Sequence, residues 1–303
     1  MKTKFLSFVM ILSMLVITSC AKDSNSANSQ TAVTSADVVA TQKVDNAVDD
    51  VSVIADDQYE VTEGSATGKL AQVSQTGKTN TLNYLSILPT CVTFSDLGST
   101  SLIRKWTITF GSGTTSCKFR GHDLLGQIIL TRTIGTTFPK TMTITYNNFS
   151  INGNKLEGTT TWLREMIGTG VDLHPKTTLT MTDMKLTTSL GVYTRNGSKT
   201  REMIAGFSTR TSPTDDIFST YGNFTTTHPN GSIFTSLIET STPLIHMTSC
   251  SLLTVPMPFP VSGILKLSKN THIATIDYGN GDCNNLATLS IDGGVATSIT
   301  LDK

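Results

Sequence analysis

The residue whose chemistry is best defined by its neighbours is Cys20. It follows Ile17, Thr18 and Ser19, and one aliphatic residue, two small residues and a cysteine match the lipobox of bacterial lipoprotein precursors. The lipoprotein signal peptidase accepts small side chains before its cut site, and the cysteine thiol is the nucleophile that takes the diacylglyceryl group. We therefore expect Cys20 to become a lipid-bearing N-terminus that binds the membrane.

The segment before Cys20 has the features of a signal peptide. Lys2 and Lys4 provide positive charge, and residues 5–18 form an apolar run of signal-peptide length. A membrane-spanning anchor is the alternative, but crossing a bilayer takes roughly 18 to 20 apolar residues. We predict that residues 1–19 are a leader. Ala21 rather than aspartate follows the cysteine, which favours the outer membrane.

Four cysteines remain once Cys20 is assigned to lipid. Four suit a disulfide framework, and export places thiols where oxidation is allowed. Three pairings are formally possible, and we favour Cys91 with Cys117 and Cys250 with Cys283 because each pair brackets one copy of a short repeat. A zinc site would require Cys-x-x-Cys or histidine spacing that is absent from the sequence.

The repeat is a strand-like run that ends in an aromatic residue, followed by Gly-x-Gly and a cysteine. One copy runs from Trp106 to Cys117 and the other from Ile273 to Cys283. The glycines suit a tight turn that returns the cysteine toward a neighbouring strand. The copies indicate either a two-fold pseudo-repeat or turn chemistry that arose twice.

The second copy also holds a group of side chains with metal-ligand chemistry. Hard oxygen ligands on a tight loop suit calcium, and the candidates are Asp277, Asn280, Asp282 and Asn284. Aspartate and asparagine also cap turns through the backbone, and the spacing departs from the EF-hand motif. A structural turn is therefore favoured over a calcium site, and no other cofactor is expected.

Histidine chemistry has weaker support. His122 stands beside Asp123, but adjacent residues on a strand point to opposite faces, and no nucleophile motif accompanies them. Asp172 and His174 have metal-friendly spacing but supply only two ligands. We therefore expect the histidines to lie singly on loops or strand edges.

Glycan chemistry would require side chains that the fold brings together. A glycosidase uses two carboxylates, and four glutamates on strand-like segments are candidates: Glu157, Glu165, Glu202 and Glu239. Trp106 and Trp162 would supply a sugar-stacking platform if exposed, although core or edge packing is favoured for both.

The element expected nearest the N-terminus is a helix. Between about residues 36 and 57, apolar residues recur at three- and four-residue steps and aspartates fall mostly off that stripe. Ser35 is the expected N-cap. The helix should pack its valine stripe on the body or, less favourably, bind a partner. Because small polar residues flank it, we predict that residues 20–80 form a flexible acidic tether with a hinge at 64–79.

From about Leu82 onward the period of the pattern changes from 3.6 to 2. Short runs rich in threonine, isoleucine, valine and aromatic residues alternate apolar with polar positions. Four dipeptides favour tight hairpins between them: Asn152-Gly153, Asn196-Gly197, Asn230-Gly231 and Asp292-Gly293. We predict that residues 81–303 form an all-β domain, an antiparallel meander folded into a sandwich or partly closed barrel.

Charge limits the class of partner. The chain has 23 basic and 23 acidic residues, and only 15% of its residues are charged, so nucleic acid is not expected as a partner. The balance conceals a split, because residues 21–64 contain two basic and nine acidic residues whereas residues 65–303 contain 19 basic and 14 acidic residues. An acidic arm therefore precedes a mildly basic body.

Several segments resemble those of a group of uncharacterised Bacteroidetes-type lipoproteins. They are Cys91-Val-Thr-Phe, the Trp-Thr-Ile-Thr-Phe-Gly run before Cys117, Asn148–Gly158, Pro260–Gly263 and Ile276–Asn285. The resemblance covers most of the chain and implies an exported lipoprotein with an all-β body, without an assigned activity. One departure is Arg120–Gly126, where the resemblance leads us to expect Gly-Arg-x-Arg-x-Gly.

The sequence alone leaves three hypotheses for function. The favoured one is a noncatalytic, lipid-anchored protein of the outer membrane that has a structural role or binds an envelope protein or a glycan. The second is a glycan-directed hydrolase whose site is assembled only in the fold, which convergent titratable groups in a pocket would favour. The third is a carrier of lipid or another hydrophobic ligand, which a large apolar concavity would favour.

Overall fold

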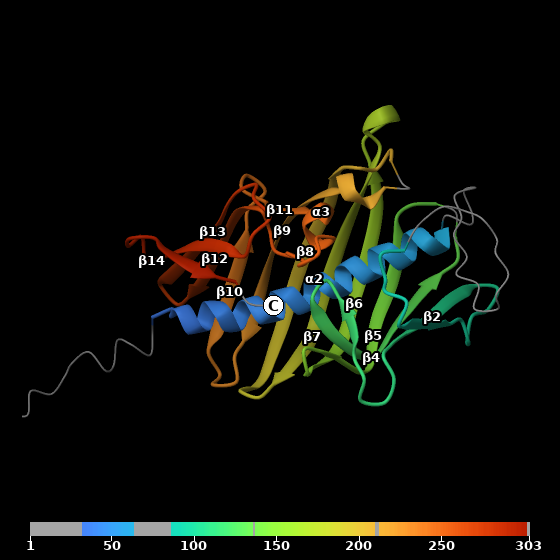
Figure 1. Ribbon diagram of the computed structural model, residues 1–303, viewed down its shortest axis with the longest axis horizontal. Coiled ribbons are helices and arrows are strands. Elements are labelled where there is room, and N and C mark those ends of the chain that lie inside the picture. The colour runs from blue at the N-terminus through green and yellow to red at the C-terminus, as the bar shows by residue number, and fades with distance from the viewer. Residues whose placement is uncertain (1–31, 64–85, 136, 210–211, 302–303) are drawn as a thin grey trace, which may run out of the picture. The chain divides into compact units, whose positions relative to one another are not determined.

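The structure is a computed structural model that describes residues 32–63, 86–135, 137–209 and 212–301. From Val33 onward the described residues belong to one compact unit, in which a long helix lies along an antiparallel sheet (Figure 1). Cys20, the leader, the start of the tether and the hinge at 64–79 lie outside the described residues.

The sheet has fifteen strands in nearly sequential order. They are β1 Val92–Ser95, β2 Ile103–Phe110, β3 Cys117–Phe119, β4 His122–Thr133, β5 Lys140–Ile151, β6 Asn154–Ile167, β7 His174–Thr188, β8 Gly191–Ala205, β9 Ile217–Thr227, β10 Ile233–Ile238, β11 Leu244–Met247, β12 Ser262–Lys269, β13 His272–Asn280, β14 Leu286–Ile291 and β15 Thr297–Thr300. Short helical turns interrupt the loops at η1 Gly170–Asp172, η2 Pro213–Asp215 and α3 Thr248–Ser251.

The predicted antiparallel all-β meander is confirmed. The order runs from β1 to β15, with β3 paired to β4, and β11 paired to both β9 and β12. Because β1 and β15 are the two ends of this order, the sheet is only partly closed. The period-2 pattern explains which side is buried: on β2, Trp106, Ile108 and Phe110 point into the core, and the residues between them are more exposed.

Helix α2 (Ser35–Glu63) is longer than predicted and begins with a different cap. The Asp37 N–H donates to Thr34 Oγ1 at 3.2 Å, and the Thr34 N–H donates to Asp37 Oδ2 at 3.0 Å. This reciprocal pair is a capping box, which satisfies otherwise unpaired N–H groups at the helix start. The cap at Ser35 was therefore wrong by one residue, because the carboxylate that completes the box lies three residues after Thr34.

The helix is buried on more than one side. Val38, Val51 and Ile54 are buried, as the apolar stripe predicts, but Asp50 and Asp57 are buried as well. A surface helix turns its polar side to water, whereas here the sheet also covers the polar side. The part of residues 20–80 from Ser35 to Glu63 is therefore a core element and not a section of flexible tether.

Both disulfides of the favoured pairing are present. Cys91 and Cys117 have Cα atoms 5.8 Å apart, and those of Cys250 and Cys283 are 5.3 Å apart. One repeat copy begins within β2 and the other within β13, and these strands lie near opposite ends of the strand order. A two-fold pseudo-repeat remains a prediction.

Three of the four dipeptides lie between paired strands. Asn152-Gly153 joins β5 to β6 with positive φ at both residues, as a type I′ turn requires, and the other two are Asn230-Gly231 and Asp292-Gly293. The hairpin at Asn196-Gly197 was wrong, because both residues lie inside β8. There Asn196 Oδ1 accepts a hydrogen bond of 2.8 Å from the Asp183 N–H, beside a bulge in β7. The asparagine side chain therefore binds the backbone of the neighbouring strand and does not form a turn.

Candidate functional site

The predicted calcium residues lie around the turn after β13. Asp277 Oδ1 accepts the Gly279 N–H at 2.9 Å, and Asn284 Oδ1 accepts the Leu286 N–H at 2.8 Å. All four candidates line one open pocket: Asp277, Asn280, Asp282 and Asn284. Among the described residues, no group of three His, Cys, Asp or Glu residues is arranged to hold a metal. Two side chains thus cap the turn, and calcium binding stays a prediction.

The residues proposed for glycan chemistry are engaged elsewhere. Each of the four glutamates has a separate basic partner: Glu157 with Lys155 at 2.7 Å, Glu165 with Lys176 at 3.2 Å, Glu202 with His174 at 3.0 Å, and Glu239 with Lys266 at 2.9 Å. Trp106 and Trp162 are buried in the core, so neither offers a stacking surface. Glu165 on β6 and Glu202 on β8 lie on either side of Lys176 in the sheet, and a glycosidase site stays a prediction.

The histidine candidates are also separated. His174 contacts the backbone carbonyl of Asp172 and the carboxylate of Glu202, so Asp172 and His174 do not present two metal ligands to one point. His122 is buried, while Asp123 is half-buried and pairs with Lys118, so the two neighbours point to opposite faces as expected.

A group of charged side chains that the sequence analysis did not connect lies between helix α2 and the inner face of the sheet. We call it the charge cluster, and it consists of five ion pairs: Asp45 with Arg195, Asp49 with Lys199, Asp50 with Arg120, Asp56 with Arg201, and Glu60 with Arg164. All five acids come from the helix, and all five cations come from the sheet or the turn before β4. The acidic arm and the basic body therefore meet here.

Local geometry explains how each element presents its charges. Asp45, Asp49, Asp56 and Glu60 recur at steps of four, seven and four residues, which places them along one side of a helix. Arg195, Lys199 and Arg201 are spaced by even numbers of residues on β8 and therefore share one face of the strand. These two spacings were the signals in the sequence, but neither shows that its charges are buried.

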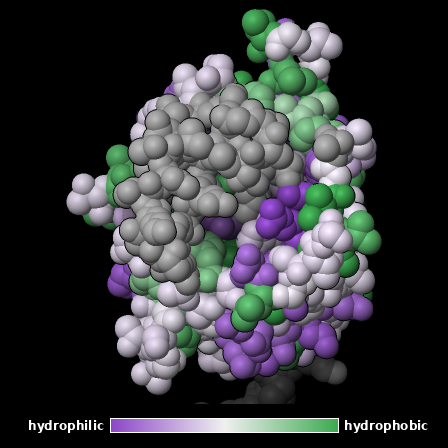
Figure 2. Space-filling view, turned by 90° about the vertical axis from the view of Figure 1, so that its right-hand side faces the viewer, coloured by the Kyte–Doolittle hydropathy of each residue, from purple (hydrophilic) through white to green (hydrophobic). Residues whose placement is uncertain are grey.

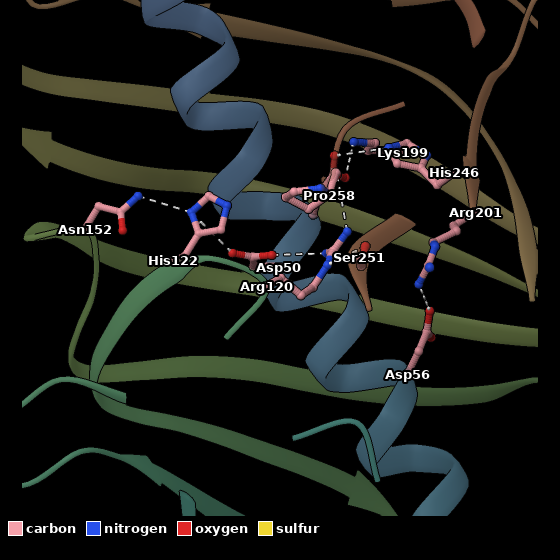
Figure 3. A network of polar contacts seen from close by, with 11 residues as sticks. Asp50, Asp56, Arg120, His122, Asn152, Lys199, Arg201, His246, Ser251 and Pro258 are labelled. Carbon is pink, nitrogen blue, oxygen red and sulfur yellow. Dashed lines mark hydrogen bonds and ion pairs between the residues drawn. The ribbon is translucent and has the colours of Figure 1, made fainter. Parts of the chain in front are cut away.

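Arg120 ties the turn before β4 to both the helix and α3. Its guanidinium donates to Asp50 Oδ1 at 3.1 Å, Ser251 Oγ at 3.2 Å and the Pro258 carbonyl at 3.3 Å (Figure 3). His122 lies on the other side of Asp50, with its Nδ1 3.1 Å from Asn152 Nδ2 and 3.7 Å from Asp50 Oδ2. Arg120 opens the segment Arg120–Gly126, which departs from the lipoprotein resemblance, and its contacts here are structural.

Burial and neighbouring charges give the helix carboxyls different protonation behaviour. Burial raises the pKa of Asp50 to about 7, although Arg120 opposes the shift. Burial also disfavours ionisation of Asp49, but the charge and hydrogen bond of Lys199 help to outweigh it and lower the pKa of Asp49. Burial raises the pKa of Asp57 to about 6 despite its hydrogen bond from Ser86. The adjacent residues Asp49 and Asp50 therefore differ in charge near neutral pH.

A cleft of about 120 Å³ opens beside the charge cluster. Its walls include helix α2, β3 with the β3–β4 turn, strands β6 to β9, and β11 with α3. Both apolar side chains and polar ones line it, and the polar ones include Asp56, Arg201 and His246. On the visible part of the face in Figure 2, hydrophobic residues are likewise scattered among hydrophilic ones. The cleft therefore suits a ligand with both an apolar and a polar part.

Comparison with known proteins adds no relative. The chain matches no protein-family model, no curated protein and no solved structure. The resemblance to Bacteroidetes-type lipoproteins therefore stays a prediction. Among the described residues, none of the helices has the length and apolar character needed to cross a membrane.

Proposed function

We propose that this protein is a lipid-anchored component of the outer membrane, attached through Cys20, whose β body is a noncatalytic binding module for an envelope component. The observation that carries the binding proposal is the cleft, whose lining includes apolar side chains and the imidazole of His246. Ion pairs such as Asp56 with Arg201 also line it.

The acids of the cleft favour binding over hydrolysis. A general acid or base must exchange a proton with its substrate. Asp56 is instead ion-paired with Arg201, and Glu60 with Arg164, while Asp57 accepts hydrogen bonds from the segment before β1. Because these contacts tie the carboxylates to the fold, we place the hydrolase second.

The volume of the cleft disfavours a carrier of long lipids. Helix α2 occupies the inner face of the sheet, and the cleft of about 120 Å³ is smaller than the roughly 300–1,000 Å³ of typical ligand pockets. A long acyl chain would need the space that the helix fills. The proposal is therefore limited to a small ligand or to a partner that inserts a single group.

The lipid anchor is tested by replacing Cys20 with alanine. The native protein should sediment with membranes, whereas Cys20→Ala should appear in the soluble fraction because no thiol remains to carry the lipid. Ser26→Ala, a few residues further along, serves as the control and should remain with the membranes. Membrane retention of Cys20→Ala after a high-salt wash would refute the anchor.

Binding is tested by site-specific crosslinking in the intact envelope. A photoreactive residue at Leu252, which lines the cleft, should crosslink to an envelope component. Leu253 is the matched control, because it is equally exposed and does not line the cleft: the exposed fractions are 46% and 45%. A product that forms equally from both positions, or from neither, would contradict the binding module.

A further inference from the structure

We propose that the cleft receives one uncharged aromatic side chain of a partner protein in the cell envelope. This inference rests on the binding function proposed above and names the group that the partner inserts. Three features of the cleft support it: the pairing of its charged residues within the protein, the composition of its apolar lining, and its volume.

The cations of the cleft are already neutralised by helix α2. Each guanidinium that lines the cleft is ion-paired with a helix carboxylate: Arg120 with Asp50 at 3.1 Å, Arg164 with Asp56 at 3.6 Å, and Arg201 with Asp56 at 3.0 Å. Figure 3 shows Arg201 directed toward Asp56 on the helix. An anionic group that entered the cleft would lose its hydration and find these cations occupied.

The other ionisable residues of the cleft do not favour a charged group either. Glu60 pairs with a guanidinium, Asp57 accepts a hydrogen bond of 2.6 Å from Ser86, and Asp216 is also engaged by another residue. Burial lowers the pKa of His246 to about 3, so its imidazole is uncharged at neutral pH, and both ring nitrogens are buried. The charges of the cleft therefore favour a neutral group.

The apolar lining favours an aromatic ring over an aliphatic chain. Several apolar side chains line the cleft: Val53, Phe119, Met203, Phe218, Met247 and Leu252. Methionine thioethers make favourable contacts with aromatic rings, and phenylalanine rings pack offset or edge-to-face against another ring. Guanidinium planes also stack on rings, and the guanidinium carbon of Arg201 lies 3.4 Å from the centroid of the Phe218 ring. A further ring would extend this arrangement.

The volume of the cleft matches a single ring. At about 120 Å³ it is close to an engineered apolar cavity of about 150 Å³ that binds benzene. Pockets for whole small molecules measure roughly 300–1,000 Å³, so this cleft would enclose only part of a larger molecule. Protein–protein interfaces commonly depend on a few aromatic side chains that fill small pockets. We therefore assign the ring to a side chain of a partner protein and not to a free small molecule.

The preference for a neutral ring is tested by titrating the full-length protein with probes of similar size. Benzyl alcohol supplies an uncharged ring, cyclohexylmethanol is its aliphatic match, and benzoate and benzylamine are charged aromatic probes. We expect benzyl alcohol to bind about threefold to tenfold more tightly than cyclohexylmethanol, and at least tenfold more tightly than either charged probe. Equal binding of cyclohexylmethanol, preferred binding of a charged probe, or no binding of benzyl alcohol would overturn the proposal.

The position of the bound ring is read from the methionine methyl resonances of protein labelled with ¹³C-methyl methionine. Met203 and Met247 line the cleft, so the ring current of bound benzyl alcohol should shift both methyl resonances. Met181 is the control, because it is buried and does not line the cleft, and its resonance should stay in place. Unmoved resonances of Met203 and Met247 would place the probe elsewhere and contradict the proposal.

A pair of variants at exposed positions tests the cleft without altering the core. Leu252→Trp should fill the cleft and reduce the affinity for benzyl alcohol by at least tenfold. Leu253→Trp should leave the affinity unchanged, because Leu253 is equally exposed but does not line the cleft. Equal effects of the two tryptophans would show that the probe binds outside the cleft.

The source of the ring is tested by competition with the crosslinking experiment described above. A photoreactive residue at Leu252 should capture a protein at a position within a few residues of a phenylalanine, tyrosine or tryptophan. Saturating benzyl alcohol should suppress most of this product, and replacing that aromatic residue of the partner with alanine should abolish it. Capture of a lipid, a glycan or a small molecule, or a protein product that benzyl alcohol leaves unchanged, would overturn the assignment to an aromatic side chain.

The two proposals fail in distinguishable ways. If benzyl alcohol does not bind but Leu252 still crosslinks selectively in the envelope, the aromatic assignment is wrong and the binding module stands. If benzyl alcohol binds beside Met203 and Met247 but neither leucine position crosslinks, the envelope partner is wrong and the cleft is a site for a free aromatic molecule.

Discussion

Asp49→Asn is expected to lower the free energy of unfolding at pH 7 by about 3–5 kcal/mol, because it removes the carboxylate that neutralises buried Lys199. Asp50→Asn, the same change one residue later, should cost less than about 1 kcal/mol. Burial raises the pKa of Asp50 to about 7, so much of it is already uncharged at this pH, and asparagine can still accept the hydrogen bond from Arg120. Urea unfolding of the two variants measures the difference.

The pH dependence separates these two aspartates further. Because the folded pKa of Asp50 is raised, its stabilising effect is complete below about pH 4, the unfolded pKa, and is lost as pH rises toward about 7. The lowered pKa of Asp49 has the opposite sign, so its contribution is present above about pH 4 and is lost at lower pH. Asp50→Asn should therefore flatten the fall in stability between about pH 4 and 7. An unchanged slope, or equal losses from both variants at pH 7, would show that the two carboxyls are equivalent.

Arg195→Met is expected to destabilise the fold by about 3–5 kcal/mol, because it leaves the Asp45 carboxylate uncompensated against the sheet. Arg195 is only 1% exposed. Its Nε donates to Thr226 Oγ1 at 3.0 Å, and its guanidinium carbon lies 4.3 Å from the centroid of the Phe224 ring. Unfolding by urea, followed by circular dichroism, measures the loss.

A second substitution tests whether helix and sheet are coupled at this pair. Arg195→Met with Asp45→Leu should recover most of the lost stability, since apolar replacement of a complete buried ion pair is often neutral. Lys266→Met is the control, because its pair with Glu239 is 40% and 41% exposed and should contribute less than about 1 kcal/mol. Strictly additive effects of the two charge-cluster substitutions would contradict a direct contact between them.

Much of the sheet could be predicted because its signals are local. Alternation along β2 places Trp106, Ile108 and Phe110 on one face, and the turn at Asn152-Gly153 brings β5 onto β6 without information from elsewhere in the chain. The failure at Asn196-Gly197 shows the limit of such signals. The same residue types also allow a strand to continue, and here Asn196 on β8 is hydrogen-bonded to Asp183 on the neighbouring strand β7.

The candidate site could not be predicted to the same extent, because its partners are far apart in the sequence. Asp45 meets Arg195, and Asp49 meets Lys199, across 150 residues in each case. A helix with aspartates beside a valine stripe is most simply interpreted as having a solvated polar side. Only the excess of cations in the body indicated that these aspartates had partners.

The sequence by itself determined the lipobox expectation at Cys20, the strand periodicity and the favoured disulfide pairing, because each depends on neighbouring residues or on short loops. The tertiary structure alone decided that helix α2 is a core element, that its acids pair with Arg120, Arg195 and Lys199, and that His246 is buried with neither ring nitrogen hydrogen-bonded among the described residues. The physical reason is burial. Whether a charged or polar side chain is solvated, paired or left to bind a ligand depends on which distant elements pack against it, and neither residue type nor local spacing specifies that.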